Sequence, residues 1–167
     1  MTTRVTEKFT QKYSLVCFLE PVLPDFKFDL DSWPLHTTIL DVFAVDATSQ
    51  EILAELKDSI SETSAITVTV QEKRYFGEKK DIPVMILEKT GQLQALHESV
   101  AMALDNIGLH MNSPQFAHEG FIPHITVKNN QAVSVGDKYT FDNITLVDMF
   151  PGGDGYGRRI LGTITLG

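Results

Sequence analysis

The amino-acid sequence predicts one α+β domain built on antiparallel sheets. Its 167 residues, 43% hydrophobic and 22% charged, have the composition of one soluble globular domain, residues 1–167, with a sizeable core, although two very small lobes would also fit. Along the chain, short β-like apolar runs precede, separate and follow two amphipathic helical segments. This order is typical of helices packed on antiparallel sheets.

The first half of the chain contains two predicted strands and one predicted helix. The runs "YSLVCFLE" (13–20) and "HTTILDVFAV" (36–45) have the pattern of strands, and the segment between them carries three prolines and is expected to be a loop. In the following helix, Thr48 and Glu51 have the spacing of a capping box. The apolar stripe of this helix consists of Ile52, Leu53, Leu56 and Ile60.

The second half begins with a predicted hairpin, in which two β-rich runs flank the charged turn "GEKKD". A second helix is predicted from Gly91 to Ile107, with Gly108 as its stop signal. Its inward positions are Leu93, Leu96, Val100, Leu104 and Ile107. Three more strands are expected at 122–128, 138–149 and 158–166, the last two joined by a glycine-rich link.

The net charge of −8 disfavours long nucleic-acid duplexes as partners, because no general positive field would attract them. A local basic cluster can still act within a Debye length of roughly 8 Å on a short or terminal polyanion. The candidates for such a cluster are Lys73, Arg74, Lys79, Lys80, Lys128, Arg158 and Arg159. Solvated surface charge is the ordinary alternative for each of them.

Cysteine use and hydropathy indicate a cytoplasmic protein. The one cysteine, Cys17, lies in an apolar run, so no intramolecular disulfide framework is expected and the chain suits a reducing compartment. The polar start "MTTRVTEKFT" differs from a signal peptide, and no apolar run approaches the ~20 residues of a membrane helix. We expect a soluble monomer without a membrane partner.

Two H-x-T motifs stand at the start of predicted strands, His36 with Thr38 in "PLHTTIL" and His124 with Thr126 in "FIPHITVK". Because side chains alternate along a strand, each histidine shares a face with its threonine while the apolar neighbours face the core. The copies are about half the chain apart, as expected if two similar halves each supply one. The alternative is two unrelated strand-end histidines bonded to their neighbours.

These motifs resemble the two-histidine (2H) phosphoesterases, the LigT-like or 2′-5′ RNA ligase-like superfamily, whose hallmark is a pair of H-x-T motifs within apolar strand residues. The similarity extends through "YFGEKKDIPVMILEKTGQLQALHESV" and "YGRRILGTITLG". The sequence departs at Thr37, where the family more often has an apolar residue, and in the acidic "LDVF". The resemblance implies a bilobal, pseudo-symmetric fold, in which two antiparallel sheets form a central cleft with helices outside.

The resemblance also implies an activity, phosphodiester hydrolysis without a metal or cofactor, with reverse 2′-5′ ligation left open. Imidazole, with a pKa near 6.5, lets one of His36 and His124 act as general base and the other as general acid. Thr38 and Thr126 would hold the non-bridging phosphate oxygens. The implied substrates are nucleotides or short RNAs with a 2′,3′-cyclic phosphate or a 2′-5′ linkage.

Three further residues are candidate substrate contacts. Lys128 shares the alternating face of the second motif and would add positive charge, unless it is simply a solvated strand end. Tyr75 or Phe76 would offer a stacking surface for a base, and alternation allows only one of them to face the cleft. A core aromatic is the alternative for each.

Two other functions remain open. One is a nucleotide-binding or RNA-end-binding module without significant catalysis, which the acidity of the chain favours. The other is a metal site on His36 and His124, since histidine is a common ligand. The metal site is disfavoured because the expected same-face neighbours, among them Leu40, include no carboxylate. No catalytic role is expected for His97, His110 or His118.

Overall fold

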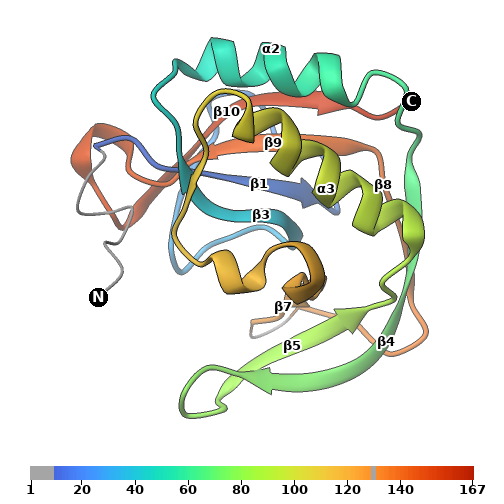
Figure 1. Ribbon diagram of the computed structural model, residues 1–167. Coiled ribbons are helices and arrows are strands. Elements are labelled where there is room, and N and C mark those ends of the chain that lie inside the picture. The colour runs from blue at the N-terminus through green and yellow to red at the C-terminus, as the bar shows by residue number, and fades with distance from the viewer. Residues whose placement is uncertain (1–9, 129–130) are drawn as a thin grey trace.

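The computed structural model describes residues 10–128 and 131–167 (Figure 1). The described strands are β1 (Tyr13–Phe18), β2 (Lys27–Asp29), β3 (His36–Ala44), β4 (Ile66–Phe76), β5 (Ile82–Leu87), β6 (His110–Met111), β7 (His124–Thr126), β8 (Lys138–Phe141), β9 (Asn143–Asp148) and β10 (Gly157–Thr165). They form one sheet in the order β2-β10-β9-β1-β3-β7-β5-β4-β8, with β6 beside β3. Every pairing is antiparallel, which confirms the predicted fold class.

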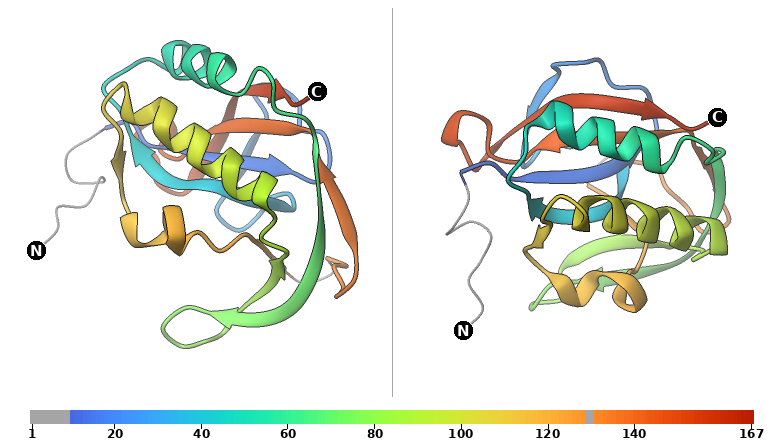
Figure 2. Two further views of the ribbon diagram at one scale, coloured as in Figure 1. Left: turned by 45° about the vertical axis from the view of Figure 1, so that its right-hand side comes forward. Right: turned by 45° about the horizontal axis from the view of Figure 1, so that its top comes forward.

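The helices α2 (Ser49–Ser59) and α3 (Gly91–Asp105) lie together on one face of this sheet (Figures 1 and 2). Thr48 caps α2 by accepting a hydrogen bond from the backbone N–H of Glu51, as its spacing predicted. Thr90 caps α3 in the same way. Short 3₁₀ turns occur at Pro114–Phe116, His118–Gly120 and Pro151–Gly153. Neither α2 nor α3 has the length and apolar composition of a membrane-spanning helix.

The main core fills the space between the helices and the sheet. Most positions of the predicted helix stripes are buried in it, namely Ile52, Leu56, Ile60, Leu93, Leu96, Val100 and Leu104. Leu53 and Ile107 are only partly buried, and Ile107 lies beyond the end of α3 at Asp105. A smaller cluster covers part of the opposite face of the sheet. It is made of Val16, Phe18, Val147 and Ile160, with Phe28 and Trp33 packed against them. The opposite face therefore has a partial cover of its own beside the H-x-T motifs.

The structure differs from the sequence prediction in several places, among them the unpredicted strand β6. β2 lies within the proline-rich segment that was expected to be a loop, and its three residues pair with β10; so short an edge strand has no periodic pattern. The run 138–149 breaks at Asp142 into β8, which pairs with β4, and β9, which pairs with β1 and β10. The two sheets that the resemblance implied are joined through the β3–β7 pairing.

Candidate active site

The structure brings the four residues of the two H-x-T motifs together, and we call them the H-x-T quartet (His36, Thr38, His124 and Thr126). In the β3–β7 register, Thr37 is paired with Ile125, and both are fully buried. His36 therefore lies opposite Thr126 on the other face, and Thr38 lies opposite His124. Diagonal neighbours in such a pairing are about 7–8 Å apart, and somewhat less at Cβ, so the two imidazoles stand near each other on this face.

Both histidines of the quartet make the same backbone hydrogen bond. Nδ1–H of His36 donates to the carbonyl of Pro34 at 2.9 Å, and Nδ1–H of His124 donates to the carbonyl of Ile122 at 2.8 Å. A carbonyl can only accept, so each neutral ring carries its proton on Nδ1. Nε2 of each ring makes no hydrogen bond with the described residues and keeps a lone pair for proton transfer.

The surroundings of the two imidazoles differ in charge. The pKa of His36 is lowered to about 4, chiefly by burial; the bond to Pro34 opposes this change, and the charges of His124 and Lys128 contribute to it. Burial also lowers the pKa of His124, but the bond to Ile122 and the carboxylate of Asp41 oppose that change. His36 is thus the ring that resists protonation more strongly in the free protein.

Asp41 reaches the quartet face because β3 contains a bulge. Val16 pairs with Thr38, but Leu15 pairs with Leu40, so β3 has one residue more than β1 between these pairs. Leu40 consequently turns into the main core, and the expectation that it faces the quartet was wrong. Asp41, which the sequence analysis noted only as the acidic residue of "LDVF", takes that face instead and lies near His124.

A pocket of about 560 Å³ opens beside the Thr38–His124 side of the quartet; we call it the His124 pocket. Its apolar walls are formed by Ile39, Phe76, Phe116, Phe121 and Ile122, and its polar side chains are Thr38, Asp41 and His124. A mostly apolar cavity with a few convergent polar groups is typical of a small-molecule site. The other side of the quartet, at His36, is closed by aromatic side chains.

Trp33 is the aromatic residue that packs closest to His36. The two rings stack with centroids 4.3 Å apart, and Phe18 approaches His36 from its edge at 6.0 Å. Trp33 stands three positions before His36 in a segment expected to be a loop, so its contact with the motif was missed. The signal that could have predicted this contact is the short distance in sequence between the tryptophan and the candidate histidine.

Lys128 lies at the His36 end of the quartet, where it contributes positive charge. Its Nζ donates to the carbonyl of Leu30 at 3.0 Å, and its side chain remains exposed. Two of the other proposed basic residues are engaged elsewhere. Arg158 is buried and donates to the carbonyls of Met149, Gly155 and Gly157, and Arg74 pairs with Glu72.

Of the two aromatic candidates on β4, Phe76 faces the site. Its ring lies edge-on to His124, with centroids 4.9 Å apart, and it lines the His124 pocket. Tyr75 is 53% exposed, and Lys73 lies over its ring. The alternation of side chains along β4 thus gives one aromatic to the pocket and the other to solvent.

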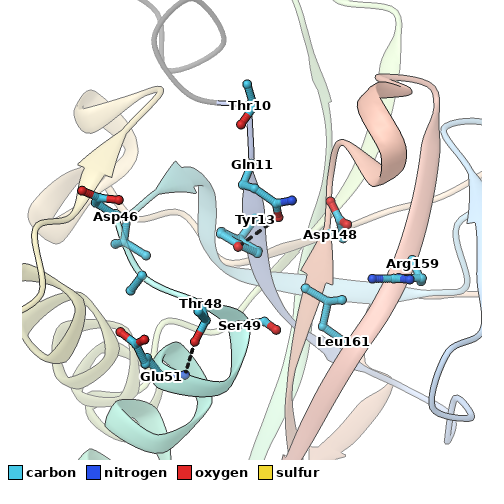
Figure 3. A pocket seen from close by; sticks show the side chains of 12 residues that line it. Thr10, Gln11, Tyr13, Asp46, Thr48, Ser49, Glu51, Asp148, Arg159 and Leu161 are labelled. Atoms are coloured by element: carbon cyan, nitrogen blue, oxygen red, sulfur yellow. Dashed lines mark hydrogen bonds between the residues drawn. The ribbon is translucent and has the colours of Figure 1, made fainter.

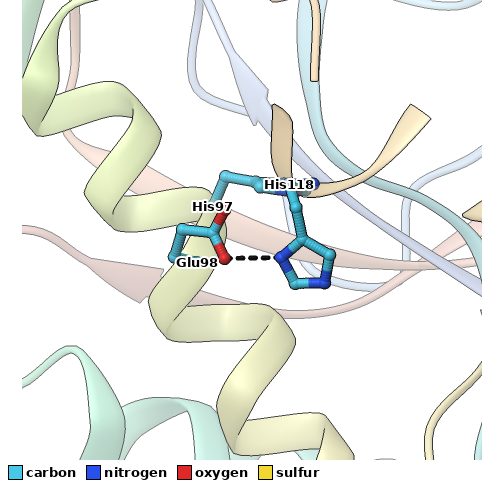
Figure 4. Close-up of side chains that lie close together, drawn as sticks. All are labelled: His97, Glu98 and His118. Carbon is cyan, nitrogen blue, oxygen red and sulfur yellow. Dashed lines mark hydrogen bonds and ion pairs between the residues drawn. The ribbon is translucent and has the colours of Figure 1, made fainter. Parts of the chain in front are cut away.

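His97 supports the His124 pocket from the helix side. Its Nδ1–H donates to the carbonyl of Ile39 at 2.6 Å, its Nε2 accepts the backbone N–H of His118 at 2.9 Å, and its ring stacks on Phe121. Donor atoms of His97, Glu98 and His118 lie within 4.8 Å of one another (Figure 4). Since both nitrogens of His97 are already hydrogen-bonded, its imidazole supports the wall of the pocket and is not free to bind a metal.

The quartet itself does not form such a donor group. Within residues 10–128 and 131–167, the metal-type donors of His36, His124 and Asp41 do not converge. A second pocket, of about 620 Å³, lies beside the start of α2 (Figure 3). It is larger than the His124 pocket, but no residue of the quartet lines it. Its charged side chains, Asp46, Glu51, Asp148 and Arg159, are mostly acidic, which does not suit a phosphate.

Comparisons with known proteins identify a family and proteins of similar fold. Residues 24–139 match the family model described as the 2′-5′ RNA ligase superfamily, whereas a comparison with curated proteins finds no match. A crystal structure of a phosphoesterase has a similar fold, with a TM-score of 0.59 and 15% identity over 93% of this chain and 98% of that one. Escherichia coli LigT complexed with 3′-AMP has a TM-score of 0.58 and 16% identity, over 93% of this chain and 98% of that one. A protein of Thermus thermophilus has a TM-score of 0.57 and 15% identity, over 93% of this chain and 97% of that one.

Proposed function

Because the chain belongs to the 2′-5′ RNA ligase superfamily, we propose that it is a metal-independent phosphodiesterase acting on 2′,3′-cyclic phosphates or 2′-5′ linkages of nucleotides or RNA ends. The observation that carries this proposal is the H-x-T quartet, in which two imidazoles with free Nε2 atoms stand diagonally across two hydroxyls. The structures of LigT with 3′-AMP, ATP and NADP+ support a nucleotide as the ligand.

Hydrolysis needs two proton transfers, one from the attacking water and one to the departing oxygen. One imidazole of the quartet takes a proton from the attacking water, and the other gives a proton to the departing ribose oxygen. Each transfer is typically worth ~10²–10⁴ in rate. The hydroxyls of Thr38 and Thr126 donate to the non-bridging oxygens and keep the phosphorus between the rings. Lys128 adds positive charge at the His36 end.

The first test removes the proton-transfer groups. His36→Ala and His124→Ala should each abolish most hydrolysis of 2′,3′-cyclic nucleotides, and the double variant should be little worse than either single one, because the two residues act as a unit. Thr38→Ala and Thr126→Ala should cost less, since each removes one positioning hydrogen bond and leaves the proton transfers intact. Steady-state kcat/KM, with thermal melting as a check on folding, measures these effects.

A binding module without catalysis is the second candidate, favoured by the net charge of −8. Absence of turnover of any cyclic nucleotide or 2′-5′ dinucleotide, together with measurable nucleotide binding, would select that function. Full activity in either histidine variant, or loss of activity with EDTA that added metal restores, would refute the metal-independent mechanism. Product analysis with ligatable RNA ends separates hydrolysis from the reverse ligation.

A further inference from the structure

Asp41 is an unexpected group in a site built for an anion. Its side chain is exposed, makes no hydrogen bond or ion pair with the described residues, and lines the His124 pocket. A carboxylate that repels a bound phosphate weakens binding, unless another part of the ligand donates hydrogen bonds to that carboxylate. The bulge that turns Asp41 toward the pocket also buries Leu40, so its position is set by the packing of β3.

We propose that the His124 pocket binds the base of the substrate and that Asp41 makes the protein selective for guanine. This inference rests on the proposed function, because the phosphate must lie on the H-x-T quartet for the base to reach the pocket. Asp41 follows Thr38 by three positions, roughly 10 Å along an extended strand. A base joined to the phosphate through one ribose extends over a comparable length.

The walls of the pocket suit a flat aromatic ring. Phe76 and the 55% exposed Phe116 come from different parts of the chain and both line the cavity. Phe121 lies deeper and is held by the ring of His97. Aromatic side chains of this kind bind any base by stacking and do not choose between bases. Of the three polar side chains in the pocket, Thr38 and His124 serve the phosphate, so the choice must come from Asp41.

An ionised carboxylate accepts hydrogen bonds and donates none. Guanine presents two adjacent donors, N1–H and N2–H, to such a group, and two parallel hydrogen bonds to one carboxylate result. Adenine, cytosine and uracil each present one donor beside an acceptor on the same edge, so a carboxylate meets one attraction and one repulsion. Hydrogen bonds to a charged group are worth enough to give roughly tenfold selectivity or more.

The experiment compares the wild type with Asp41→Asn, using Asp46→Asn as the matched control. Asp46 is also exposed and lies outside the His124 pocket. The kcat/KM values are measured for the four nucleoside 2′,3′-cyclic phosphates, and the Kd values for the four nucleoside 3′-monophosphates by calorimetry. We expect the wild type to favour guanine by about tenfold and Asp41→Asn to lose this preference, while Asp46→Asn retains it.

Equal values for all four bases in the wild type would overturn the inference. So would an equal loss for all four bases in Asp41→Asn, since that result would mean that the carboxylate acts only through its charge on His124. The calorimetric arm separates this inference from the proposed function. Selective binding of guanosine 3′-monophosphate without turnover would refute the phosphodiesterase function and support the guanine site. Turnover without base preference would support the phosphodiesterase function and refute the guanine site.

Discussion

The two imidazoles of the quartet are alike in hydrogen bonding and unlike in surroundings. His36 is stacked on Trp33 and has the cation of Lys128 nearby, whereas His124 has the carboxylate of Asp41 nearby. Desolvation penalises the charged form of both rings, and the neighbouring charges strengthen this effect at His36 and weaken it at His124. Since the rings also repel each other when charged, their titrations belong to the pair.

The lowered pKa values of both histidines predict an acidic pH optimum for kcat/KM. The free protein must hold one neutral and one protonated imidazole, and the pKa values of both rings lie below the ordinary 6.5, with that of His36 at about 4. The bell-shaped profile of kcat/KM should therefore peak below about 6.5. A bound phosphate anion favours the imidazolium, so the profile of kcat should peak at a higher pH. Steady-state kinetics across the acidic and neutral range tests both statements, and a kcat/KM maximum above 6.5 would contradict this interpretation.

At the scale of single residues, sequence reasoning named the quartet, Lys128 and Phe76 as candidates. It missed the contact of Trp33 with His36 and did not place Asp41 beside His124. The period of two along a strand was enough to put His36 and Thr38 on one face. The same period gave the wrong residue, Leu40, two positions after Thr38, because a bulge changes the alternation and leaves no pattern in the sequence. The presence of Asp41 in the pocket depends on that one extra residue in β3.

At the scale of elements, the β4–β5 hairpin supplies one wall of the His124 pocket. Its strands pair from Val70 with Leu87 to Phe76 with Ile82, and it extends away from the helices (Figure 1). The charged turn and the flanking β-rich runs predicted this hairpin. Whether Tyr75 or Phe76 faces the pocket depends on how the hairpin joins the sheet. Alternation along β4 does not decide this, whereas the pairing of β5 with β7 does.

The hairpin gives a matched pair of substitutions. Phe76→Ala should weaken nucleotide binding, by ~1–3 kcal/mol if the ring stacks on a base, because it removes a pocket wall and the edge contact with His124. Tyr75→Ala should leave binding unchanged, since Tyr75 is exposed and does not line the pocket. Calorimetric Kd values for a nucleoside 3′-monophosphate, with melting curves for both variants, make the comparison. A larger loss in Tyr75→Ala, or no loss in either, would rule out stacking on Phe76.

At the scale of the whole molecule, the short β7 is what joins the two halves of the sheet. It pairs with β3 on one side and with β5 on the other, so the two motifs meet at the seam. The sequence predicted the strands and helices from local periodicity. The order of the strands follows from long-range pairing, which no local pattern encodes. The clearest case is the run 138–149, whose first part, β8, pairs with β4 and whose second part, β9, pairs with β1.

We propose that residues 1–167 unfold as one domain, because the two halves share one core. Cys17 and Ile39 from one side of the seam and Met85 and Ile125 from the other belong to the same buried cluster, and α3 packs against both β3 and α2. Separating the halves would expose this apolar surface to water. Heating should therefore give one transition with equal calorimetric and van't Hoff enthalpies.

The one tryptophan provides a local probe for this prediction. Trp33 lies beside His36 on the β1–β3 side of the seam, so its fluorescence reports that half, whereas far-ultraviolet circular dichroism reports the whole sheet. The two signals should change at the same temperature if the core is shared. A fluorescence transition that precedes or follows a biphasic dichroism curve would instead indicate two lobes that unfold separately, with a quartet assembled only when they dock.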